Sequence, residues 1–392
     1  YSLGASRSVI REIFEYAKAR KAEIGEDKVF DFSIGNPNVP APECVGETLV
    51  SLIQESDPVK LHGYTSAQGD AGVRKKISEF IENTYNKDGD PVSSPDMIYM
   101  TSGAAAALTC TLTAILNKGD RVIALAPFFP EYRVFTERTG AELFPVMCDE
   151  VTMRPRLDRI EKAVNEKTAA VIINSPNNPT GVVYPKEDIK AISDLLRKKS
   201  AEIGRPIYLI ADEPYRELVY GGTDVPYIPC YYENTVVCYS LSKSLSLPGE
   251  RIGYVSVSPR ASDAKKLYLS VCGAGRALGF VCATSLYQYM FQYLLGKTSD
   301  ISVYEKNRDI LCKALGEYGY KTAKPDGAFY LFVKSPENDA KAFCEKAKKY
   351  ELLLVPSDDF GCSGYVRIAY CVSETQIRNS LPAFKALAES YK

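Results

Sequence analysis

A lysine in a polar turn is the strongest chemical signal in this sequence. The apolar run Thr235–Tyr239 is typical of a buried strand, and Lys243 follows it inside the serine-rich turn Ser240–Ser246. Burial disfavours the charged form of lysine, so a lysine directly after a buried strand is suited to act as a free amine and nucleophile. Arg251 follows eight residues later, and its guanidinium together with the serine hydroxyls would suit a bound phosphate. The alternative is an ordinary surface lysine in a polar loop.

Two other apolar runs also lead into polar side chains. Asn178 lies in the turn that follows Ala169–Ile173, and Asp212 directly follows Ile207–Ala211, with Tyr215 three residues later. A carboxylate at the end of a buried strand is costly unless a cationic group meets it. We therefore expect a cationic partner for Asp212, while capping of a following helix is the alternative.

The segment after Met97–Met100 predicts an anion site. Ser102 and Gly103 lead into an alanine-rich helix that starts near Ala104. Such a helix start presents free backbone N–H groups and the positive end of the helix dipole. The motif is not a Walker A loop, because no Gly-Lys-Ser/Thr follows it. An ordinary strand–helix unit is the alternative, and a matching cation such as Arg251 favours the phosphate interpretation.

Arg367 stands in the middle of an expected strand, Tyr365–Tyr370, among hydrophobic neighbours. A buried guanidinium there needs a partner, and its planar fork suits a carboxylate in a bidentate contact. That carboxylate is either an internal Asp or Glu or one that belongs to a ligand. Phe129 precedes a proline in an expected loop, where it should offer a rigid flat surface. Tyr64 lies among turn residues and should be exposed to polar surroundings.

Apolar runs alternate with helical segments through most of the chain, which predicts an α/β fold. Near-continuous apolar runs indicate strands covered on both faces, hence a mainly parallel sheet of about seven strands sandwiched by helices. Ligands bind beyond the carboxyl ends of strands in such sheets, which is where the polar side chains above are found. The expected strands are Met97–Met100, Arg121–Leu125, Ala141–Val146, Ala169–Ile173, Ile207–Ala211, Thr235–Tyr239 and Gly253–Val257.

The pattern changes near Leu286, which predicts a smaller second domain of α+β type. A long helical stretch, Ser285–Ala314, is expected to open it. We predict a large domain at 46–285, a small C-terminal domain at 286–392, and an N-terminal segment at 1–45 that joins the small domain. A helix at Ser8–Ala22, capped by Ser8, is expected in that segment. The glycine-rich stretch Gly273–Gly279 is predicted to be a loop near a subunit or domain junction.

Composition limits the function classes. The chain has 392 residues and a net charge of −1, so it offers no broad basic surface for nucleic acid or an anionic membrane. Its 11 cysteines are scattered, which is typical of a reducing compartment, and no secretory signal is visible, so we predict a cytoplasmic protein. With His62 as the only histidine, neither a zinc site nor a Ser-His-Asp triad is expected.

The Lys243 segment and the sequence Asn178-Pro179-Thr180-Gly181 resemble motifs of class I/II aminotransferases. These are fold-type-I enzymes, aspartate aminotransferase among them, that use pyridoxal 5′-phosphate (PLP). The resemblance extends from Ile34 to Arg367 with the motifs in family order. It implies that Lys243 binds the cofactor aldehyde covalently and later moves a proton between substrate and cofactor. It also implies that Asp212 pairs with the protonated ring nitrogen.

The resemblance implies further roles around the cofactor and the substrate. Asn178 and Tyr215 would bind the phenolic oxygen of the ring, and Phe129 would stack on the ring. The α-carboxylate of the substrate would be held by Gly35, Asn178 and Arg367. The implied phosphate contacts are Ser102, Gly103, Ala104, Ser240, Ser242, Arg251 and, from the neighbouring subunit of a homodimer, Tyr64.

The implied activity is transfer of an amino group between an α-amino acid, with aspartate as one candidate, and a 2-oxo acid by a ping-pong mechanism. Several aspartate aminotransferase relatives place a lysine just after the phosphate loop to hold the distal carboxylate, but here 104–107 is all alanine. Either Arg276 or Arg133 replaces it, or aspartate and glutamate are not the preferred substrates. Two alternatives share the cofactor residues. One is a β-eliminating (C–S) lyase, and the other is a non-catalytic PLP-binding sensor, which the lack of a DNA-binding module before Ile34 disfavours.

Overall fold

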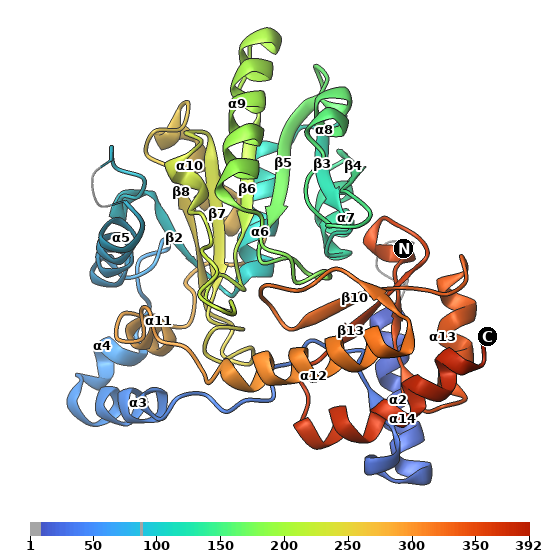
Figure 1. The fold of residues 1–392 in the computed structure, drawn as a ribbon. Helices are drawn as coiled ribbons and strands as arrows, with labels where there is room; N and C mark the ends of the chain where they lie inside the picture. Colours follow the sequence, from blue (N-terminus) through green and yellow to red (C-terminus); the bar gives the residue numbers. More distant parts are fainter. Residues whose placement is uncertain (1–8, 87–88) are drawn as a thin grey trace.

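The structure is a computed structural model that describes residues 9–86 and 89–392. Its largest element is a seven-stranded sheet with the order β2-β8-β7-β6-β5-β3-β4 (Figure 1). Only β8 runs antiparallel to its neighbours. The strands are β2 (Ile98–Thr101), β3 (Arg121–Ala126), β4 (Glu142–Met147), β5 (Thr168–Asn174), β6 (Tyr208–Asp212), β7 (Thr235–Ser240) and β8 (Gly253–Val257).

This sheet is buried on both faces, as its apolar runs indicate. Along β5, Ala170 and Ile172 belong to one hydrophobic cluster, and Val171 and Ile173 belong to another on the opposite face. Side chains that alternate between two cores require apolar residues at every position of the strand. One cluster includes residues of α5 (Ala71–Tyr85), α8 (Leu157–Ala163) and α9 (Lys186–Ile203). The other includes residues of α6 (Ala104–Ile115), α7 (Glu131–Glu137) and α10 (Ala264–Ala277). The predicted α/β fold class is thus confirmed.

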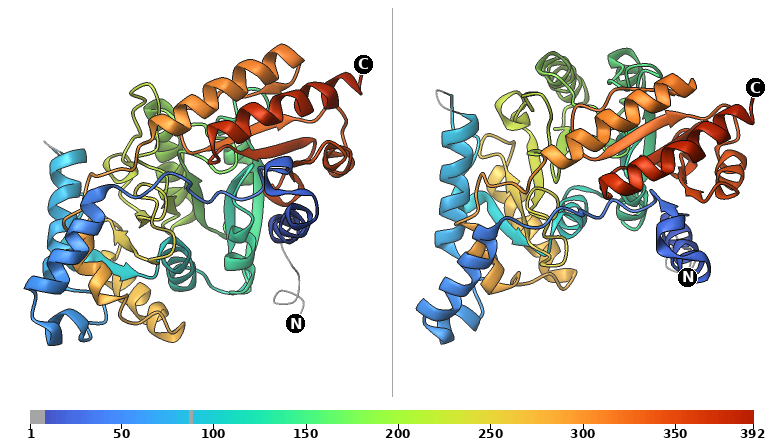
Figure 2. Two further views of the ribbon diagram at one scale, coloured as in Figure 1. Left: turned by 90° about the horizontal axis from the view of Figure 1, so that it is seen from below. Right: turned by 60° about the horizontal axis from the view of Figure 1, so that its bottom comes forward.

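A smaller sheet lies beside the carboxyl ends of these strands. Its order is β12-β13-β10-β9, and all its pairs are antiparallel. Helices α12 and α14 pack side by side along it (Figure 2). These elements are β9 (Lys321–Thr322), β10 (Tyr330–Lys334), β12 (Val355–Pro356), β13 (Tyr365–Ala369), α12 (Ser302–Tyr318), α13 (Ala340–Lys348) and α14 (Glu374–Glu389).

The N-terminal part of the chain contacts both of these layers. Helix α2 (Val9–Ile24) packs against β12, and β1 (Phe30–Asp31) pairs in parallel with β11 (Leu352–Leu353). The chain then crosses to α3 (Glu43–Glu55) and α4 (Pro58–His62), which contact α11 (Ser285–Phe291) (Figure 2). Short 3₁₀ helices lie at Glu26–Lys28, Pro95–Met97, Ile228–Cys230 and Asp358–Phe360.

Three local expectations need correction or limitation. The stretch 285–314 is not one helix, because α11 ends at Phe291 and α12 begins at Ser302. The stretch Gly273–Gly279 is not a loop but largely the end of α10, where Gly275 lies so close to Tyr99 that an added Cβ would fall 2.2 Å from its hydroxyl. Close helix–strand packing therefore explains that glycine. Ser8, expected as a helix cap, lies outside the described residues.

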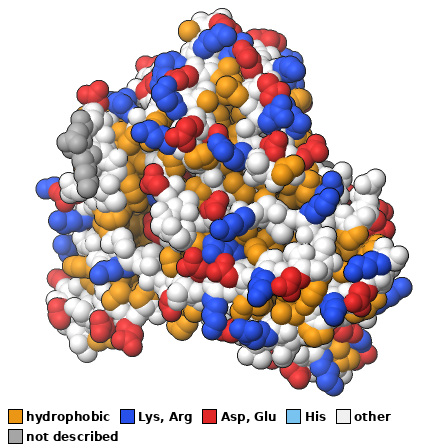
Figure 3. Space-filling view, in the orientation of Figure 1, with side chains coloured by type: hydrophobic (Ala, Val, Ile, Leu, Met, Phe, Trp, Pro, Cys, Tyr) orange, Lys and Arg blue, Asp and Glu red, His pale blue; other side chains and the backbone are white. Residues whose placement is uncertain are grey.

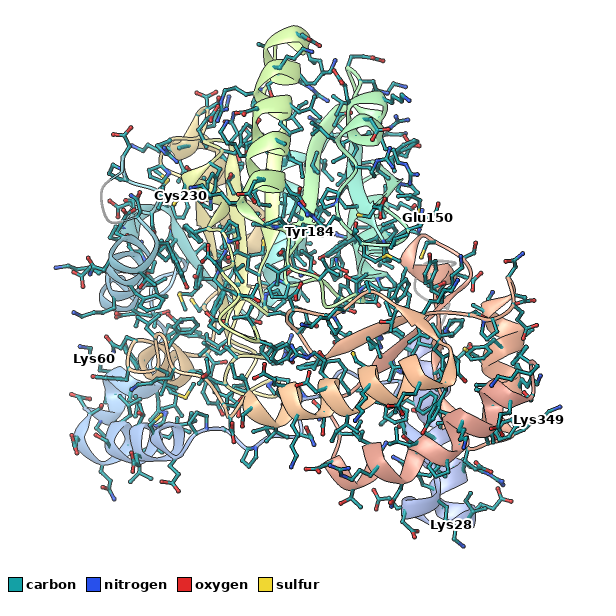
Figure 4. The ribbon with its side chains drawn as sticks, in the orientation of Figure 1. Lys28, Lys60, Glu150, Tyr184, Cys230 and Lys349 are labelled. Carbon is teal, nitrogen blue, oxygen red and sulfur yellow. The ribbon has the colours of Figure 1, made fainter. Side chains whose placement is uncertain are left out.

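The surface facing the viewer in Figure 3 carries acidic and basic side chains side by side, without a large region of one sign. The two sheets meet near Glu150, whose backbone carbonyl accepts a hydrogen bond from the Tyr365 hydroxyl at 3.2 Å (Figure 4). Among the described residues, none of the helices has the length and apolar character that crossing a membrane would require.

Candidate active site

The polar residues predicted from the strand ends converge at one edge of the seven-stranded sheet. Asn174 and Asp212 are register partners on β5 and β6, and Ser240 pairs with Gly253 on β7 and β8. Asn174 ties two strand ends together, because its Nδ2 donates to the Asp212 carbonyl at 2.8 Å. Its Oδ1 accepts from the backbone N–H of Asn178 at 2.7 Å, which fixes the following turn.

A cavity of about 290 Å³ opens at this edge, between the two sheets. Eleven of the fourteen residues predicted as site residues line it. These are Gly35, Ala104, Phe129, Asn178, Asp212, Tyr215, Ser240, Ser242, Lys243, Arg251 and Arg367. The remaining three, Ser102, Gly103 and Tyr64, do not line it.

The Lys243 amine lies in this cavity and donates to the Gly35 carbonyl at 2.7 Å. Burial lowers the pKa of Lys243 to about 8, and the nearby charges of Arg367 and Arg251 add to this effect. The amine is therefore a better nucleophile near neutral pH than an ordinary lysine. Gly35 itself could not carry a side chain, because an added Cβ would lie 1.9 Å from the Tyr330 hydroxyl.

Asp212 is a buried carboxylate without a cationic partner among the described residues. Its Oδ2 accepts a hydrogen bond from the Tyr132 hydroxyl at 2.5 Å, and its Oδ1 has no partner. Burial raises the pKa of Asp212 to about 7, and the Tyr132 hydrogen bond opposes that rise. A cationic group bound beside Oδ1 would restore the charged form.

Arg367 is buried on β13 and turns its guanidinium into the same cavity. It donates to Asn178 Oδ1 at 3.2 Å and to the Ser33 carbonyl at 2.5 Å, while Nε has no partner. The guanidinium carbon lies 4.8 Å from the centre of the Tyr330 ring. Arg367 makes no salt bridge in the described part of the chain, so the alternative of an internal Asp or Glu partner is not seen. A carboxylate ligand could occupy the free side of the guanidinium.

The opposite end of the cavity can bind an anion. Helix α6 begins there after Gly103, whose φ of 84° favours glycine, and Ala104 and Ala105 line the cavity. The Arg251 guanidinium lies beside Gly103, since a Cβ added to this glycine would be 2.9 Å from Nη2. The Ser240 hydroxyl is buried and has no partner within the described residues. A phosphate could receive hydrogen bonds from all three sources.

Several cavity residues were not predicted. Tyr330 lines the cavity beside Tyr215, with their hydroxyls 3.0 Å apart, and Ile10 of α2 also lines it. Tyr132 does not line the cavity but donates to Asp212, which does. The only sequence signal for Tyr132 was its place just after the Phe129 loop. The sequence around Ile10 shows only a helical hydrophobic period, which does not identify the surface that Ile10 contacts.

Tyr64 and the two arginines expected as partners of a distal carboxylate, Arg133 and Arg276, are not part of this cavity. Tyr64 is 97% exposed and does not line the cavity. Neither Arg133 nor Arg276 lines the cavity, and Arg133 forms an exposed salt bridge with Glu137 at 2.8 Å. The proposed replacements for a distal-carboxylate lysine are therefore not found in the site of this chain.

Known proteins share this architecture. The family model "Aminotransferase class I and II" matches residues 27–384. The chain belongs to the class I and II aminotransferase family. It is 31% identical to an aspartate aminotransferase of Thermotoga maritima over 91% of this chain and 90% of that protein. It is 30% identical to (5-formylfuran-3-yl)methyl phosphate transaminase of Methanocaldococcus jannaschii, with 94% of each chain covered.

Solved structures agree with this assignment. An amino transferase from Eubacterium rectale is 53% identical, with a TM-score of 0.96 over 100% of this chain and 98% of that one. Aspartate aminotransferase from Thermus thermophilus with maleate is 25% identical, with a TM-score of 0.85 and 97% of each chain covered. The protein is accordingly a PLP-dependent aminotransferase.

The residues present fit PLP. The cofactor has a ring nitrogen, an aldehyde and a phosphate. The cavity offers the Asp212 carboxylate for the ring nitrogen and the Lys243 amine for the aldehyde. The anion-binding end formed by Ser240, Arg251 and α6 suits the phosphate. Asp212 Oδ1 and Ser240 Oγ are buried without partners in the described part of the chain, and a group bound at each end would satisfy them.

Proposed function

We propose that this aminotransferase binds an α-amino acid with its carboxylate on Arg367 and Asn178, and its amino group beside Lys243. Arg367 already holds Asn178 Oδ1 at 3.2 Å, so the two side chains form one preorganised surface. The unpartnered Arg367 Nε supports this assignment, because a second carboxylate oxygen would satisfy it. Gly35 lines the same cavity, and its lack of a side chain lets the Tyr330 hydroxyl approach the backbone there.

PLP supplies an electron sink for the electron pair released at the substrate Cα when a proton leaves. Lys243 would bind the cofactor aldehyde in the resting enzyme. When the substrate amine takes its place, the freed Lys243 amine would carry the proton from Cα to the cofactor and later return it. Asp212 would keep the ring nitrogen protonated, with Tyr132 holding the carboxylate in position. Tyr215 and Asn178 would contact the phenolic oxygen and Phe129 the ring face.

The observation that carries this proposal is the presence of three unpartnered polar atoms in the cavity that contains the Lys243 amine. Asp212 Oδ1, Ser240 Oγ and Arg367 Nε belong to residues that line this cavity together with Lys243. Buried polar groups without partners are rare in folded proteins. Three in one cavity therefore support a bound cofactor with a cationic nitrogen and a phosphate, and a substrate with a carboxylate.

The test is a half-reaction with a panel of amino acids. Protein loaded with PLP is mixed with one amino acid at a time, beginning with aspartate, and the absorbance of the cofactor is followed. We expect conversion of the cofactor to its amine form and release of a 2-oxo acid, with reversal when a 2-oxo acid alone is added. Ammonia release without formation of the amine form would contradict the proposal.

We further propose a homodimer in which Tyr64 reaches the phosphate end of the neighbouring site. Its 97% exposure supports this, because a tyrosine that projects fully into solvent gains little in a monomer. Mixed dimers test it. A Lys243→Ala chain paired with a Tyr64→Ala chain would restore one complete site, so about half of the wild-type activity should return. No recovery above the two parent variants would contradict the shared site.

We propose a small domain formed by 286–392 together with the N-terminal segment 1–45, and a large domain at 46–285. The parallel pairing of β1 with β11 supports the first grouping. We also propose a cytoplasmic location, because all 11 cysteines are free thiols, as expected in a reducing compartment.

A further inference from the structure

A buried charged cluster lies behind the active site and is not used by the chemistry above. Arg216 donates to both carboxylate oxygens of Glu213 at 2.6 Å, and to the carbonyls of Val225 and Pro226 at 2.9 and 3.0 Å. This bidentate pair balances its own charges. A second carboxylate of the cluster, Glu217, has no salt bridge within the described residues.

Glu217 instead terminates a chain of hydroxyl groups. Its Oε1 accepts from the Tyr239 hydroxyl at 2.8 Å, and its Oε2 is buried without a partner in the described part of the chain. The Tyr239 oxygen also lies 3.4 Å from Ser244 Oγ. When Glu217 is ionised, the single hydroxyl proton of Tyr239 goes to Glu217, so Ser244 is the donor to Tyr239. In that state the chain runs from Ser244 through Tyr239 to Glu217.

Ser244 is the residue after Lys243, and it is fully buried. Its side chain belongs to the hydroxyl chain, and its backbone carbonyl accepts from the Ser299 N–H at 2.8 Å, in the segment between α11 and α12. Ser244 does not line the cavity, so its hydroxyl is not needed for the phosphate. The turn that carries Lys243 is thus fixed from behind at one residue by two independent hydrogen bonds.

We propose that Glu217 is a positioning residue for Lys243 and acts through Tyr239 and Ser244. This inference rests on the proposed role of Lys243. A buried carboxylate without a direct salt bridge costs stability. Burial raises the pKa of Glu217 to about 7, although the Tyr239 hydrogen bond and the charge of Arg216 oppose that rise. Orientation of the Lys243 turn is a function that accounts for this cost. Groups that orient a metal ligand from behind change affinity or activity by about 10- to 100-fold, and we expect an effect of the same size on Lys243.

The experiment compares four variants of the PLP-loaded protein with wild type. Glu217→Leu, Tyr239→Phe and Ser244→Ala each break the chain, while Glu217→Gln keeps an acceptor for the Tyr239 hydroxyl. We expect the first three to lower the half-reaction rate about 10- to 100-fold and to shift the pH midpoint of the bound-cofactor absorbance by about 0.5 unit or more. Glu217→Gln should stay within about threefold of wild type. A Glu217→Leu/Tyr239→Phe double variant should lose little more than either single one, because both break the same chain.

Tyr227→Phe is the matched control. Tyr227 lies in the same cluster, with its ring 5.1 Å from the Arg216 guanidinium carbon, but its hydroxyl has no partner among the described residues. Its removal should leave rate and pH midpoint unchanged. Lower thermal stability in the chain-breaking variants with wild-type rate and pH midpoint would overturn the proposal. Should Glu217→Leu fail to fold, Tyr239→Phe and Ser244→Ala decide the question.

This experiment also separates failure of the inference from failure of the proposed function. If the wild-type protein converts no amino acid, the proposed function fails. The pH midpoint of covalent PLP attachment to Lys243 can then still be measured, and it tests whether Glu217 orients this lysine. An unchanged midpoint in all chain-breaking variants would overturn the inference alone.

Discussion

The Tyr132 hydroxyl donates to Asp212 Oδ2 at 2.5 Å, from the first turn of α7 to the end of β6. Both groups are buried, and the hydrogen bond favours the charged form of the carboxylate against the effect of burial. In the proposed binding mode, Tyr132 would therefore help Asp212 to remain an anion beside a cationic ring nitrogen.

Replacing Tyr132 by phenylalanine should weaken catalysis. Loss of the hydrogen bond raises the pKa of Asp212 further, and the half-reaction rate is expected to fall about 10- to 100-fold, as for a buried hydrogen bond to a charged group. Tyr184→Phe is a suitable control, because Tyr184 (labelled in Figure 4) is equally buried. Within the described residues its hydroxyl has one hydrogen-bond partner, Cys148 Sγ at 3.9 Å. Equal rates for Tyr132→Phe and wild type would argue against the role of this tyrosine.

The low pKa of Lys243 should appear in the pH dependence of PLP uptake. Only the neutral amine attacks an aldehyde, so the rate of covalent attachment should rise with pH and level off above about pH 8. Absorbance of the protein-bound cofactor, measured over a pH series with Lys243→Ala as background, gives this profile. A rate that still climbs about tenfold per unit above pH 9 would indicate an ordinary lysine.

Glu217 should make the cofactor-free protein less stable at high pH. Its pKa is raised from 4.5 to about 7 by burial, so the native state holds the proton more tightly than the unfolded state does. Its stability contribution is complete below the unfolded pKa and is lost as pH rises toward 7. Glu217→Gln removes the charge, so it should raise the free energy of unfolding by about 3 kcal/mol more at pH 8 than at pH 4.5, as measured by urea unfolding. A gain that is the same at both pH values would contradict the assignment.

Arg367 should control substrate binding but not cofactor binding. Arg367→Gln removes the charge that would meet the substrate carboxylate, and we expect KM for the amino acid to rise about 100-fold, in line with about 3 kcal/mol for a buried charge contact. Arg367→Lys keeps the charge but loses the bidentate geometry, so it should recover only part of the loss. Equilibrium titration with PLP serves as the control and should be unaffected. A parallel loss of PLP affinity would show that Arg367 supports the cofactor instead.

Local sequence patterns were sufficient for the sheet and for much of the site. Asp212 and Lys243 each follow an apolar run of strand length, and parallel strands place such residues at one edge of the sheet. The Tyr132–Asp212 pair could not be predicted, because the partners are 80 residues apart in the sequence. The sequence of α7 also does not indicate the direction in which the Tyr132 side chain points. The contact of Ile10 with the cavity depends on how α2 packs against the rest of the chain, which a helical period does not specify. Gly275 looked like a loop residue because its close contact with Tyr99 is a tertiary effect.

The central claim is that the Lys243 amine itself carries the proton during the reaction. The most direct measurement is the single-turnover rate at which PLP-loaded Lys243→Ala converts a good amino acid substrate. We expect a loss of about four orders of magnitude relative to wild type, the upper end of general acid–base catalysis by one side chain. Conversion at the wild-type rate by Lys243→Ala would contradict the account.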